Sequence, residues 1–424
     1  MKKYDLIVAG GGLAGVGAAV CAARQGISVL LIEKSGCLGG AICNNLVYPF
    51  TNYYTFSPED NKKQYINLGI FKEMRDREEK YRTDLCEPKG KPEYQFKPEY
   101  YKLLLDDMVV EAGVDVLFHT TLTEVNTNNG KIEKIMVATP SGNLALEAKF
   151  YIDSTGNGDL LAMAGCEFQL GRESDGLCQP MTACFRMSGV NIEKYKKDHN
   201  RLNALYKQWQ AEGKLINPRN NILIFYGIGE GILHFNTTRV IKHNPVDVFD
   251  LSKAEIEARK QINELVRFLK ANSDAFKDST VISIANEIGV RESRKLKGEH
   301  ILDSRELKEM VEFEDSIAVG NYDIDIHSPD GGGTSHYYFK KGEYYQIPYK
   351  CLITKSFDNL LASGRCISAT HEAQASVRVM PICACTGQAA GVAAAIAKKT
   401  NATVHTVDIK TIQKALEESG AKIR

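Results

Sequence analysis

One stretch near the start of the chain, residues 4–34, constrains the fold more than any other. It contains an apolar run of strand length, then Gly10, Gly12 and Gly15 in G-x-G-x-x-G spacing, a helix of small residues, and a second apolar strand that ends at Glu33. In such a unit the first glycine permits a tight turn, the second lets a pyrophosphate approach the backbone, and the third lets the helix lie close to the sheet. The free N–H groups and positive dipole of the helix N-terminus favour phosphate. The order of these features predicts a dinucleotide site in a doubly wound α/β fold with a parallel sheet.

Glu33 restricts which dinucleotide the site accepts. It follows Gly15 by 18 residues, a position from which a carboxylate accepts hydrogen bonds from a ribose diol and repels a 2′-phosphate. The sequence therefore predicts FAD or NAD and argues against NADP. Taken alone, the glycine spacing would equally suit an ordinary glycine-rich turn.

Charge and composition exclude some classes of partner. The 424 residues include 53 Lys and Arg and 53 Asp and Glu, so the net charge is zero, and 43% of the residues are hydrophobic. A nucleic-acid or anionic-membrane partner would require a surplus of positive charge, so neither is expected. The weakly polar run over 389–397 is too short to span a bilayer. We expect no signal peptide before the first strand.

The cysteines do not suggest a cross-linked or metal-bound protein. There are eleven of them, scattered without C-x-x-C spacing, which suits neither a disulfide framework nor a zinc or iron–sulfur site. We therefore expect no metal site, and a cytoplasmic location is the simplest expectation. Cys37 and Cys43 are expected to be one of two things. They are either redox-active residues near a flavin or, as we favour, small buried apolar side chains.

Residues 1–164 are expected to form the first part of the dinucleotide-binding domain. A small antiparallel sheet is expected within it, because Asn-Gly and Pro-x-Gly turns separate β-branched runs. A strand over 150–153 then ends in Ser-Thr-Gly, which brings a second backbone segment to the carboxyl edge of the parallel sheet, where ligands bind. The other expected elements are helices over 60–80 and 97–112, a strand over 114–118, and hairpin strands over 121–126, 132–138 and 144–148.

Residues 165–350 differ in pattern and are expected to form an inserted α+β substrate domain. Strands are mixed with long helices, and the second helix is expected to begin at a capping box of Ser252 and Glu255. The expected helices cover 192–211 and 252–270, and the expected strands cover 181–188, 221–225, 232–236, 281–285, 316–321 and 344–348.

Residues 351–424 are expected to complete the dinucleotide-binding domain. A strand that begins at residue 358 ends in Gly364. A helix that begins near Pro381 carries glycine and alanine at three- and four-residue spacing, which brings its axis close to a neighbouring helix. A final amphipathic helix is expected over 406–419.

Four segments together resemble a known family. They are the glycine fingerprint with Glu33, and residues 38–40, 153–156 and 364–381. The chain is similar to bacterial FAD-dependent oxidoreductases, which share the glutathione-reductase type of FAD-binding fold and are distantly similar to the flavoproteins of fumarate reductase and succinate dehydrogenase. The resemblance covers the first and last blocks well and the middle block weakly.

The resemblance implies FAD as the cofactor and assigns its contacts residue by residue. The chain departs from the family pattern where many relatives have a Gly-Asp pair that holds the ribityl hydroxyls, because Ser376, Val377 and Arg378 stand there. The implied contacts are Gly10, Gly12, Leu13, Ala14 and Gly15 at the pyrophosphate; Glu33, followed by Lys34, at the adenosine ribose; Leu38, Gly39 and Gly40 at the ribityl chain or flavin edge; Leu122 at the adenine; Thr155, Gly156 and Asp159 closing over the cofactor; Gly364 and Arg365 at the flavin phosphates; and Val379 and Met380 at the helix that points at the flavin pyrimidine.

Two residues before that last helix are the first catalytic candidates. His371 could carry a proton, and Arg378 could bind a carboxylate or stabilise an anionic intermediate. The alternative is that His371 only caps a turn and Arg378 pairs with Glu372.

The middle block contributes two further candidates. Arg291, in the segment 290–294, resembles part of a family motif and is either catalytic or a salt-bridge partner. His327 precedes the glycine loop 331–333, which is either a lid over the flavin or, as we favour, a surface turn.

Three functions remain open on the sequence. The first is an FAD enzyme that transfers hydride between a small organic substrate and the flavin N5. The second is a flavoprotein that carries electrons within a complex, and the third is an enzyme that uses NAD alone. The long insertion between the two FAD blocks favours the first. Because no second G-x-G-x-x-G unit is present, we expect electrons to come from the substrate or from a redox partner protein.

Overall fold

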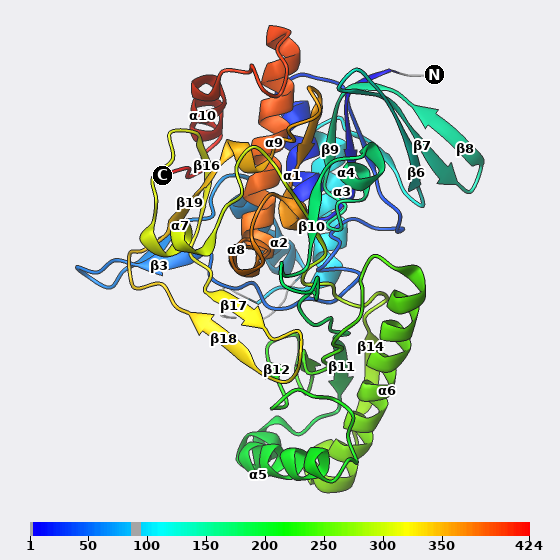
Figure 1. Cartoon of the computed structure of the whole chain (residues 1–424). Helices are drawn as coiled ribbons and strands as arrows, with labels where there is room; N and C mark the ends of the chain where they lie inside the picture. Colours follow the sequence, from blue (N-terminus) through cyan, green and yellow to red (C-terminus); the bar gives the residue numbers. More distant parts are fainter. Residues whose placement is uncertain (1–2, 86–94) are drawn as a thin grey trace.

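The computed structural model describes residues 3–85 and 95–424. Its centre is a five-stranded parallel sheet with the strand order β20-β9-β1-β2-β5 (Figure 1). This arrangement confirms the predicted α/β fold. The strands are β1 (Tyr4–Ala9), β2 (Val29–Ile32), β5 (Asp115–Leu117), β9 (Ala148–Asp153) and β20 (Leu360–Ala362).

The strands of this sheet end at one level. Ala9 lies opposite Ile32 on one side and Asp153 on the other, and Asp153 also lies opposite Ala362. The central strands are apolar and buried, as expected for a parallel sheet covered on both faces. The segments that follow these strands therefore emerge together at the carboxyl edge.

Two helices of small residues pack tightly against each other beside the sheet. They are α1 (Leu13–Arg24) and α9 (Met380–Thr400), which cross near the centre of the view in Figure 1. A Cβ atom on Gly387 would lie 2.0 Å from the carbonyl oxygen of Ala14, and one on Gly391 would lie 2.1 Å from that of Ala18. Helix α9 is long and apolar enough to cross a membrane by composition, but its apolar stretch is completely buried inside the molecule.

The remaining elements of the first block agree with the sequence except at one place. The predicted helix over 60–80 is wrong for its first half, which forms a hairpin instead; the turn is supported by Asn61 in the left-handed region, and the helix begins only after Gly69. The elements are β3 (Tyr54–Phe56), β4 (Lys63–Tyr65), α2 (Ile70–Asp84), α3 (Pro98–Glu111), β6 (Thr121–Asn128), β7 (Lys131–Thr139), β8 (Gly142–Leu146) and α4 (Asp159–Ala164).

A four-stranded antiparallel sheet with two long helices forms the lower part of the view in Figure 1. Its apolar side chains, from Met181 to Ile288, form a second hydrophobic core. The predicted capping box of Ser252 and Glu255 is wrong: the long helix begins earlier, where the Asp247 side chain accepts the Asp250 N–H. The elements are β11 (Phe185–Ser188), α5 (Ile192–Ala211), β12 (Ile224–Phe225), β13 (Leu233–Phe235), α6 (Val248–Asn272) and β14 (Thr280–Ile284).

Three two-stranded ladders and three short α-helices are the remaining strands and α-helices of the described residues. Apolar residues between 302 and 353 pack into the same core as the parallel sheet. The predicted domain limits at residues 165 and 350 stay a prediction. The elements are β10 (Phe168–Leu170) with β15 (Arg294–Leu296), β16 (Ser316–Gly320) with β19 (Tyr345–Pro348), β17 (Ile324–His327) with β18 (Thr334–Tyr337), and the helices α7 (Ser304–Glu309), α8 (His371–Val377) and α10 (Ile409–Glu418).

Candidate functional site

The carboxyl edge of the parallel sheet brings together the segments that the sequence marked. The Gly10 N–H donates to the carbonyl of Ile32 at 2.8 Å, and the Ser363 N–H donates to that of Asp153 at 2.9 Å. The hydroxyls of Ser154 and Ser363 are 2.7 Å apart. Parts of the chain that are more than three hundred residues apart thus meet at one edge, where doubly wound folds bind ligands.

The three fingerprint glycines have different roles. Gly10 has a φ of +101°, and a Cβ there would lie 2.5 Å from the carbonyl oxygen of Ser154. A Cβ on Gly15 would lie 1.7 Å from the carbonyl oxygen of Gly10. A Cβ on Gly12 would meet nothing within 4 Å. Gly10 and Gly15 are therefore required by packing, whereas Gly12 borders an open space at the start of α1.

The N-termini of α1 and α9 lack side-chain caps, as do those of α2, α3 and α4. The N-cap residues of α1 and α9, Gly12 and Val379, offer no side-chain hydrogen bond. By contrast, α5, α6, α8 and α10 are capped by Asn191, Asp247, Thr370 and Asp408. Uncapped N–H groups and the helix dipole favour an anion, and an FAD pyrophosphate fits the open space at Gly12.

Glu33 is buried at the end of β2, with 6% of its surface exposed. Its Oε2 accepts the Gly11 N–H at 2.6 Å, and its Oε1 accepts both the N–H and the hydroxyl of Ser35 at 2.8 Å. A carboxylate offers about four acceptor positions, so Oε2 can accept a further bond from a ribose hydroxyl. Lys34 lies apart from this arrangement, because its Nζ is 3.0 Å from Glu287 on the surface.

The loop that follows Glu33 folds back onto the fingerprint. The Gly39 N–H donates to the carbonyl of Gly11 at 2.8 Å, and Leu38 is buried beside it. A Cβ on Gly40 would lie 3.0 Å from the Cα of Gly12. This loop therefore borders the same open space as the start of α1.

The polar side chains after β9 support the next helix. The Thr155 hydroxyl donates to Asp153 at 2.7 Å and accepts the Asp159 N–H at 2.9 Å. Asp153 also accepts the Leu161 N–H at 2.9 Å, and burial raises the pKa of Asp153 to about 6. Asp159 pairs with Arg294 at 2.9 Å. The side chains of Thr155 and Asp159 are thus engaged in the start of α4.

Arg365 crosses from the end of β20 to this loop. Its guanidinium donates to Asn157 Oδ1 at 2.7 Å and to the carbonyl of Val290. A Cβ on Gly156 would lie 2.9 Å from that guanidinium, and one on Gly364 would lie 2.9 Å from the Cβ of Ala14. Gly156 therefore leaves room for the Arg365 guanidinium, and Gly364 permits the close approach of the segment after β20 to α1. Leu122 lies farther along, in β6 opposite Val137, and packs against the main core.

His371, the first residue of α8, is held by a buried hydrogen bond. Its Nδ1 lies 2.8 Å from Glu292, which also contacts Lys295 at 2.5 Å. Burial alone would raise the pKa of Glu292, but the His371 hydrogen bond and the Lys295 charge hold it below its ordinary value. Thr370, and not His371, caps α8. His371 Nε2 makes no hydrogen bond to the part of the chain that the structure describes.

Arg378 lies between α8 and α9 and contacts Asp325 rather than Glu372. Its Nη2 is 3.5 Å from Asp325 Oδ2, which also accepts the Tyr322 hydroxyl at 2.8 Å. His327 Nε2 is 3.1 Å from the same oxygen. The other ring nitrogen, Nδ1, lies 2.6 Å from Arg239. Because a guanidinium can only donate, Nδ1 accepts and Nε2 carries the proton.

His327 is therefore a neutral side chain with both ring nitrogens occupied. Burial lowers its pKa well below the ordinary value, and the charges of Arg291 and Arg378 act in the same direction. The nearby glycine loop is attached to this cluster, because Arg239 also donates to the carbonyls of Gly331 and Gly333 at 3.0 and 2.9 Å.

Two buried glutamines connect the His371 and His327 groups. Gln179 donates its N–H to Glu292 at 3.0 Å, and its side-chain oxygen accepts the His327 N–H at 3.4 Å. Gln374 donates to the carbonyl of Arg291 at 2.9 Å and accepts from Gln179 at 3.2 Å. The four predicted catalytic residues thus belong to one hydrogen-bonded network.

Several members of this network were missed in the sequence. Glu292 and Asp325 lie within one or two residues of Arg291 and His327, so proximity in the chain was a usable signal. Arg239 follows an expected strand without any motif, and only the folded chain brings it to His327.

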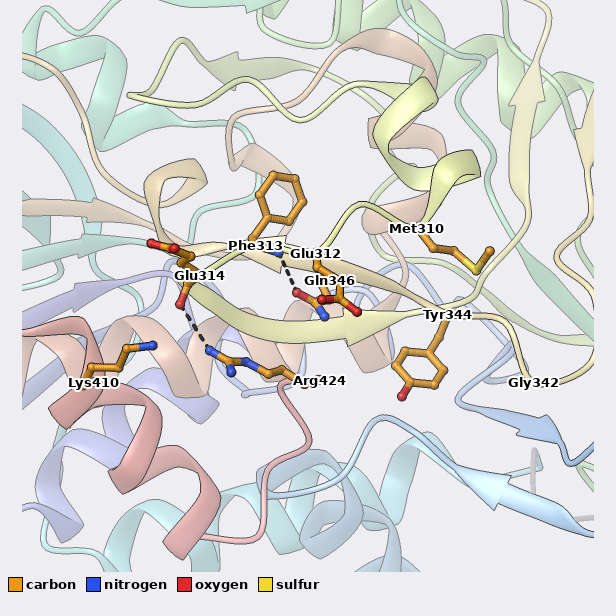
Figure 2. A pocket seen from close by; sticks show the side chains of 9 residues that line it. All are labelled: Met310, Glu312, Phe313, Glu314, Gly342, Tyr344, Gln346, Lys410 and Arg424. Carbon is orange, nitrogen blue, oxygen red and sulfur yellow. Dashed lines mark hydrogen bonds between the residues drawn. The ribbon is translucent and has the colours of Figure 1, made fainter.

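A pocket of about 770 Å³ lies elsewhere on the molecule (Figure 2). In Figure 2 its walls come from β19, α10 and the segments beside them, with Arg424 donating to the carbonyl of Glu314 at 3.3 Å and the Phe313 N–H donating to Gln346 at 2.8 Å. None of the residues that line it borders the open space at Gly12 or belongs to the network of His371 and His327.

Comparison with known proteins identifies the family. The profile of the FAD dependent oxidoreductase family matches residues 5–416. The structure is also similar to a geranylgeranyl bacteriochlorophyll reductase-like protein from Thermoplasma acidophilum, with 14% identity over 100% of this chain and 85% of that one and a TM-score of 0.47. A p-nitrophenol 4-monooxygenase from Pseudomonas putida matches with 10% identity, coverage of 98% and 84%, and a TM-score of 0.45. The assignment rests on the family profile, which spans nearly the whole chain: the protein belongs to the FAD-dependent oxidoreductase family, and it is an enzyme with FAD as its cofactor.

Proposed function

We propose that this enzyme transfers hydride between a small organic substrate and the N5 atom of FAD, with the substrate bound beside the N-terminus of α9. The observation that carries the proposal is the position of Arg378. It directly precedes Val379, the uncapped N-terminus of α9, and it contacts Asp325 of β17. Arg378 and Asp325, which could bind a substrate, therefore lie next to the place where the family resemblance puts the flavin ring.

The proposed cofactor contacts lie in a cradle formed by the start of α1 at Gly12, Glu33, the loop at Gly39 and Gly40, and the start of α9. The start of α1 at Gly12 would hold the pyrophosphate, Glu33 the adenosine ribose, and the dipole of α9 would favour negative charge on the flavin ring. When bound, FAD supplies a hydride acceptor or donor at N5. The protein then needs to orient the substrate, exclude water and move one proton.

His371 is the proposed proton carrier. Its Nδ1 is fixed by Glu292, which orients the ring and stabilises a positive charge on it, while Nε2 has no partner among the described residues. His327 is better suited to hold Arg378 and Asp325 in place, because both of its ring nitrogens are already engaged.

Anaerobic flavin spectroscopy tests this proposal. The FAD-loaded protein would be mixed with hydroxy and amino acids as hydride donors, and the dithionite-reduced protein with keto and unsaturated acids as acceptors. We expect one class to change the flavin spectrum within seconds. Arg378→Met and His371→Asn should keep the flavin but slow that change by about 100-fold or more.

Arg259→Met is the matched control, because Arg259 is an exposed residue of α6 that pairs with Glu255. It should react like the wild type. Unchanged rates in both site variants would contradict the proposal. A flavin that responds only to a redox partner protein would support an electron carrier instead.

A further inference from the structure

The four-stranded sheet has one apolar face and one polar face. Phe185 and Met187 of β11 point into the second core, so Arg186 between them lies on the opposite face. Arg186 pairs across the strands with His234, which is likewise excluded from that core. The ring of His234 lies 5.3 Å from that of Tyr48, which belongs to the core of the FAD-binding part. The polar face is therefore turned toward the FAD-binding part.

Two arginines buried at this face have no counter-charge. Arg186 and Arg219 are 5% and 8% exposed. Each has its Nε and one terminal nitrogen completely buried without a hydrogen bond. Within residues 3–85 and 95–424, no carboxylate lies within ion-pair distance of either guanidinium. Arginine stays protonated in proteins, so these are buried charges rather than neutral groups.

Arg239 and Arg291 add to this charge without neutralising it. Arg239 is 1% exposed and donates to carbonyls, to Thr334 and to His327, none of which is an acid. Arg291 donates to the carbonyl of Pro180 and the hydroxyl of Thr182, both at 2.7 Å. Burial, with repulsion from Arg378, Arg219 and Arg239, lowers the pKa of Arg291 to about 9.

The other titratable groups nearby do not supply the missing negative charge. Asp325 is one carboxylate, and Arg378 already contacts it. Burial raises the pKa of the Cys184 thiol to about 12, although Arg291, Arg186 and Arg219 all act to lower it. Burial lowers the pKa of His234 to about 3, so its ring is neutral at pH 7. Five guanidinium groups thus face one buried carboxylate, Asp325, and the charge of the exposed Glu99 acts on Arg186 only from beyond ion-pair distance.

We propose that this polar face binds a substrate with two or more oxyanion groups, carboxylate or phosphate. Guanidinium groups bind both kinds of oxyanion through paired hydrogen bonds, and buried positive charge is strongly unfavourable without a counter-charge. Arg186 lies on the sheet with His234, whereas Arg378 lies at the start of α9. The positive charge is therefore divided between two separate positions, which is why we expect at least two oxyanion groups in the substrate. This inference rests on the proposed function and specifies the chemical class of its substrate.

Binding of defined anions to the FAD-loaded protein tests the inference. Keeping FAD bound occupies the phosphate cradle at α1, so an added anion reports on the polar face. The probes would be acetate, succinate, citrate, inorganic phosphate, glycerol 3-phosphate and the neutral analogue succinamide. Flavin absorbance changes and thermal melting would give the affinities. We expect probes with several charges to bind about tenfold tighter than acetate, and succinamide not to bind.

Variants locate the site. Arg186→Met and Arg219→Met should each weaken binding of the best probe about tenfold or more, while keeping the flavin. Arg259→Met, which changes an exposed residue of α6, should bind the best probe like the wild type. If a variant fails to fold, the wild type still provides a test, because probes with several charges should bind it tighter than acetate while succinamide does not bind.

The arms of the experiment separate the possible results. Tighter binding of succinate or citrate indicates a carboxylic acid, and tighter binding of glycerol 3-phosphate indicates a phosphorylated substrate; both support the inference. A protein that retains its flavin, reacts with a neutral organic donor and binds no anion would overturn it while leaving the proposed function intact. Anion binding without any substrate-dependent flavin change would contradict the proposed function alone.

Discussion

Glu33 holds the fingerprint loop together and is also the proposed acceptor for the adenosine ribose. Its carboxylate accepts the N–H groups of Gly11 and Ser35 from within a buried position. Hydrogen bonds to a charged group contribute more than those between neutral groups, about 1.5–3 kcal/mol each. Its substitution should therefore affect both the loop and the cofactor.

The first prediction concerns that carboxylate. Glu33→Gln should weaken FAD binding by about 10- to 100-fold, because the amide replaces one acceptor oxygen by a donor beside the N–H of Gly11 or Ser35. Quenching of FAD fluorescence during titration of the apoprotein measures this. Lys34→Gln, which alters only a surface pair with Glu287, is the control. Equal affinities for the two variants would contradict the assignment of Glu33.

The second prediction concerns Cys37, which lies in the loop next to the cradle. A hydrogen bond with Cys43, together with the nearby charge of Lys102, lowers the pKa of the Cys37 thiol to about 7. The thiolate is the reactive form, so alkylation by iodoacetamide should rise with pH and reach half its maximum near pH 7. Peptide mass spectrometry gives the rate at Cys37.

The Cys43→Ala variant provides the control for this titration. Without the hydrogen bond, the midpoint should move up toward the ordinary thiol value of about 8.5. A wild-type midpoint already near that value would show that Cys37 is not activated. Buried thiols such as Cys184, whose pKa is raised to about 12, should stay unmodified in the folded protein.

Residues were predictable from sequence where their partners are close in the chain. Glu33 and the glycines form a local unit, so their arrangement follows from spacing alone. Arg219 and Arg239 are brought to the polar face by tertiary packing, and no local pattern marks them. Arg378 was singled out correctly as a residue near α9, but its partner, Asp325, lies 53 positions away.

At the scale of elements, the contact between α1 and α9 fixes the positions of the two helix starts that we propose to hold FAD. The two helices approach so closely that the carbonyl oxygens of Ala14 and Ala18 occupy the space of missing Cβ atoms on Gly387 and Gly391. Each helix begins at the carboxyl edge of the sheet without a side-chain cap. Their separation therefore determines the distance between the two proposed anchoring points of FAD.

The third prediction is a graded loss of stability in three glycine variants. A Cβ at Gly391 would lie 2.1 Å from a backbone oxygen, one at Gly17 would lie 2.9 Å from the Ala384 oxygen, and one at Gly333 would meet nothing within 4 Å. Gly391→Ala should lower the free energy of unfolding by about 1–3 kcal/mol, Gly17→Ala by less, and Gly333→Ala by under ~0.5 kcal/mol. Chemical denaturation of the apoproteins measures the order. A Gly391→Ala protein as stable as Gly333→Ala would show that the helices are not in close contact.

The elements themselves were predicted well where periodicity and turn residues agree. The parallel strands, the hairpins of β6–β8 and the helices α5 and α9 follow the sequence pattern closely. The start of α6 was misplaced because Ser252, within the helix, donates to the carbonyl of Val248 instead of capping. The start of α2 was misplaced because polarity alone does not distinguish a surface hairpin from a surface helix.

At the scale of the whole molecule, FAD binding should stabilise the fold as one ligand held by two distant parts of the chain. The fourth prediction uses Gly12→Glu, whose side chain would enter the open space at the start of α1 and repel phosphate. FAD at 100 times its dissociation constant should stabilise the wild type by about 2.7 kcal/mol and leave this variant unaffected.

The apoprotein provides the control for this variant. Because a Cβ on Gly12 would meet no other atom within 4 Å, the unliganded variant should melt close to the wild type. Thermal denaturation with and without FAD measures both values. A variant that is still stabilised by FAD would indicate that the phosphates bind elsewhere.

A crystal structure with FAD bound tests the central claim most directly, namely that the fingerprint and the segment before α9 hold the same cofactor. We predict density for the pyrophosphate at the backbone N–H groups that follow Gly12, and density for the flavin ring at Val379 and Met380, with Arg378 beside it. A flavin that contacts only one of these two segments, or that lies outside the carboxyl edge of the parallel sheet, would contradict the account.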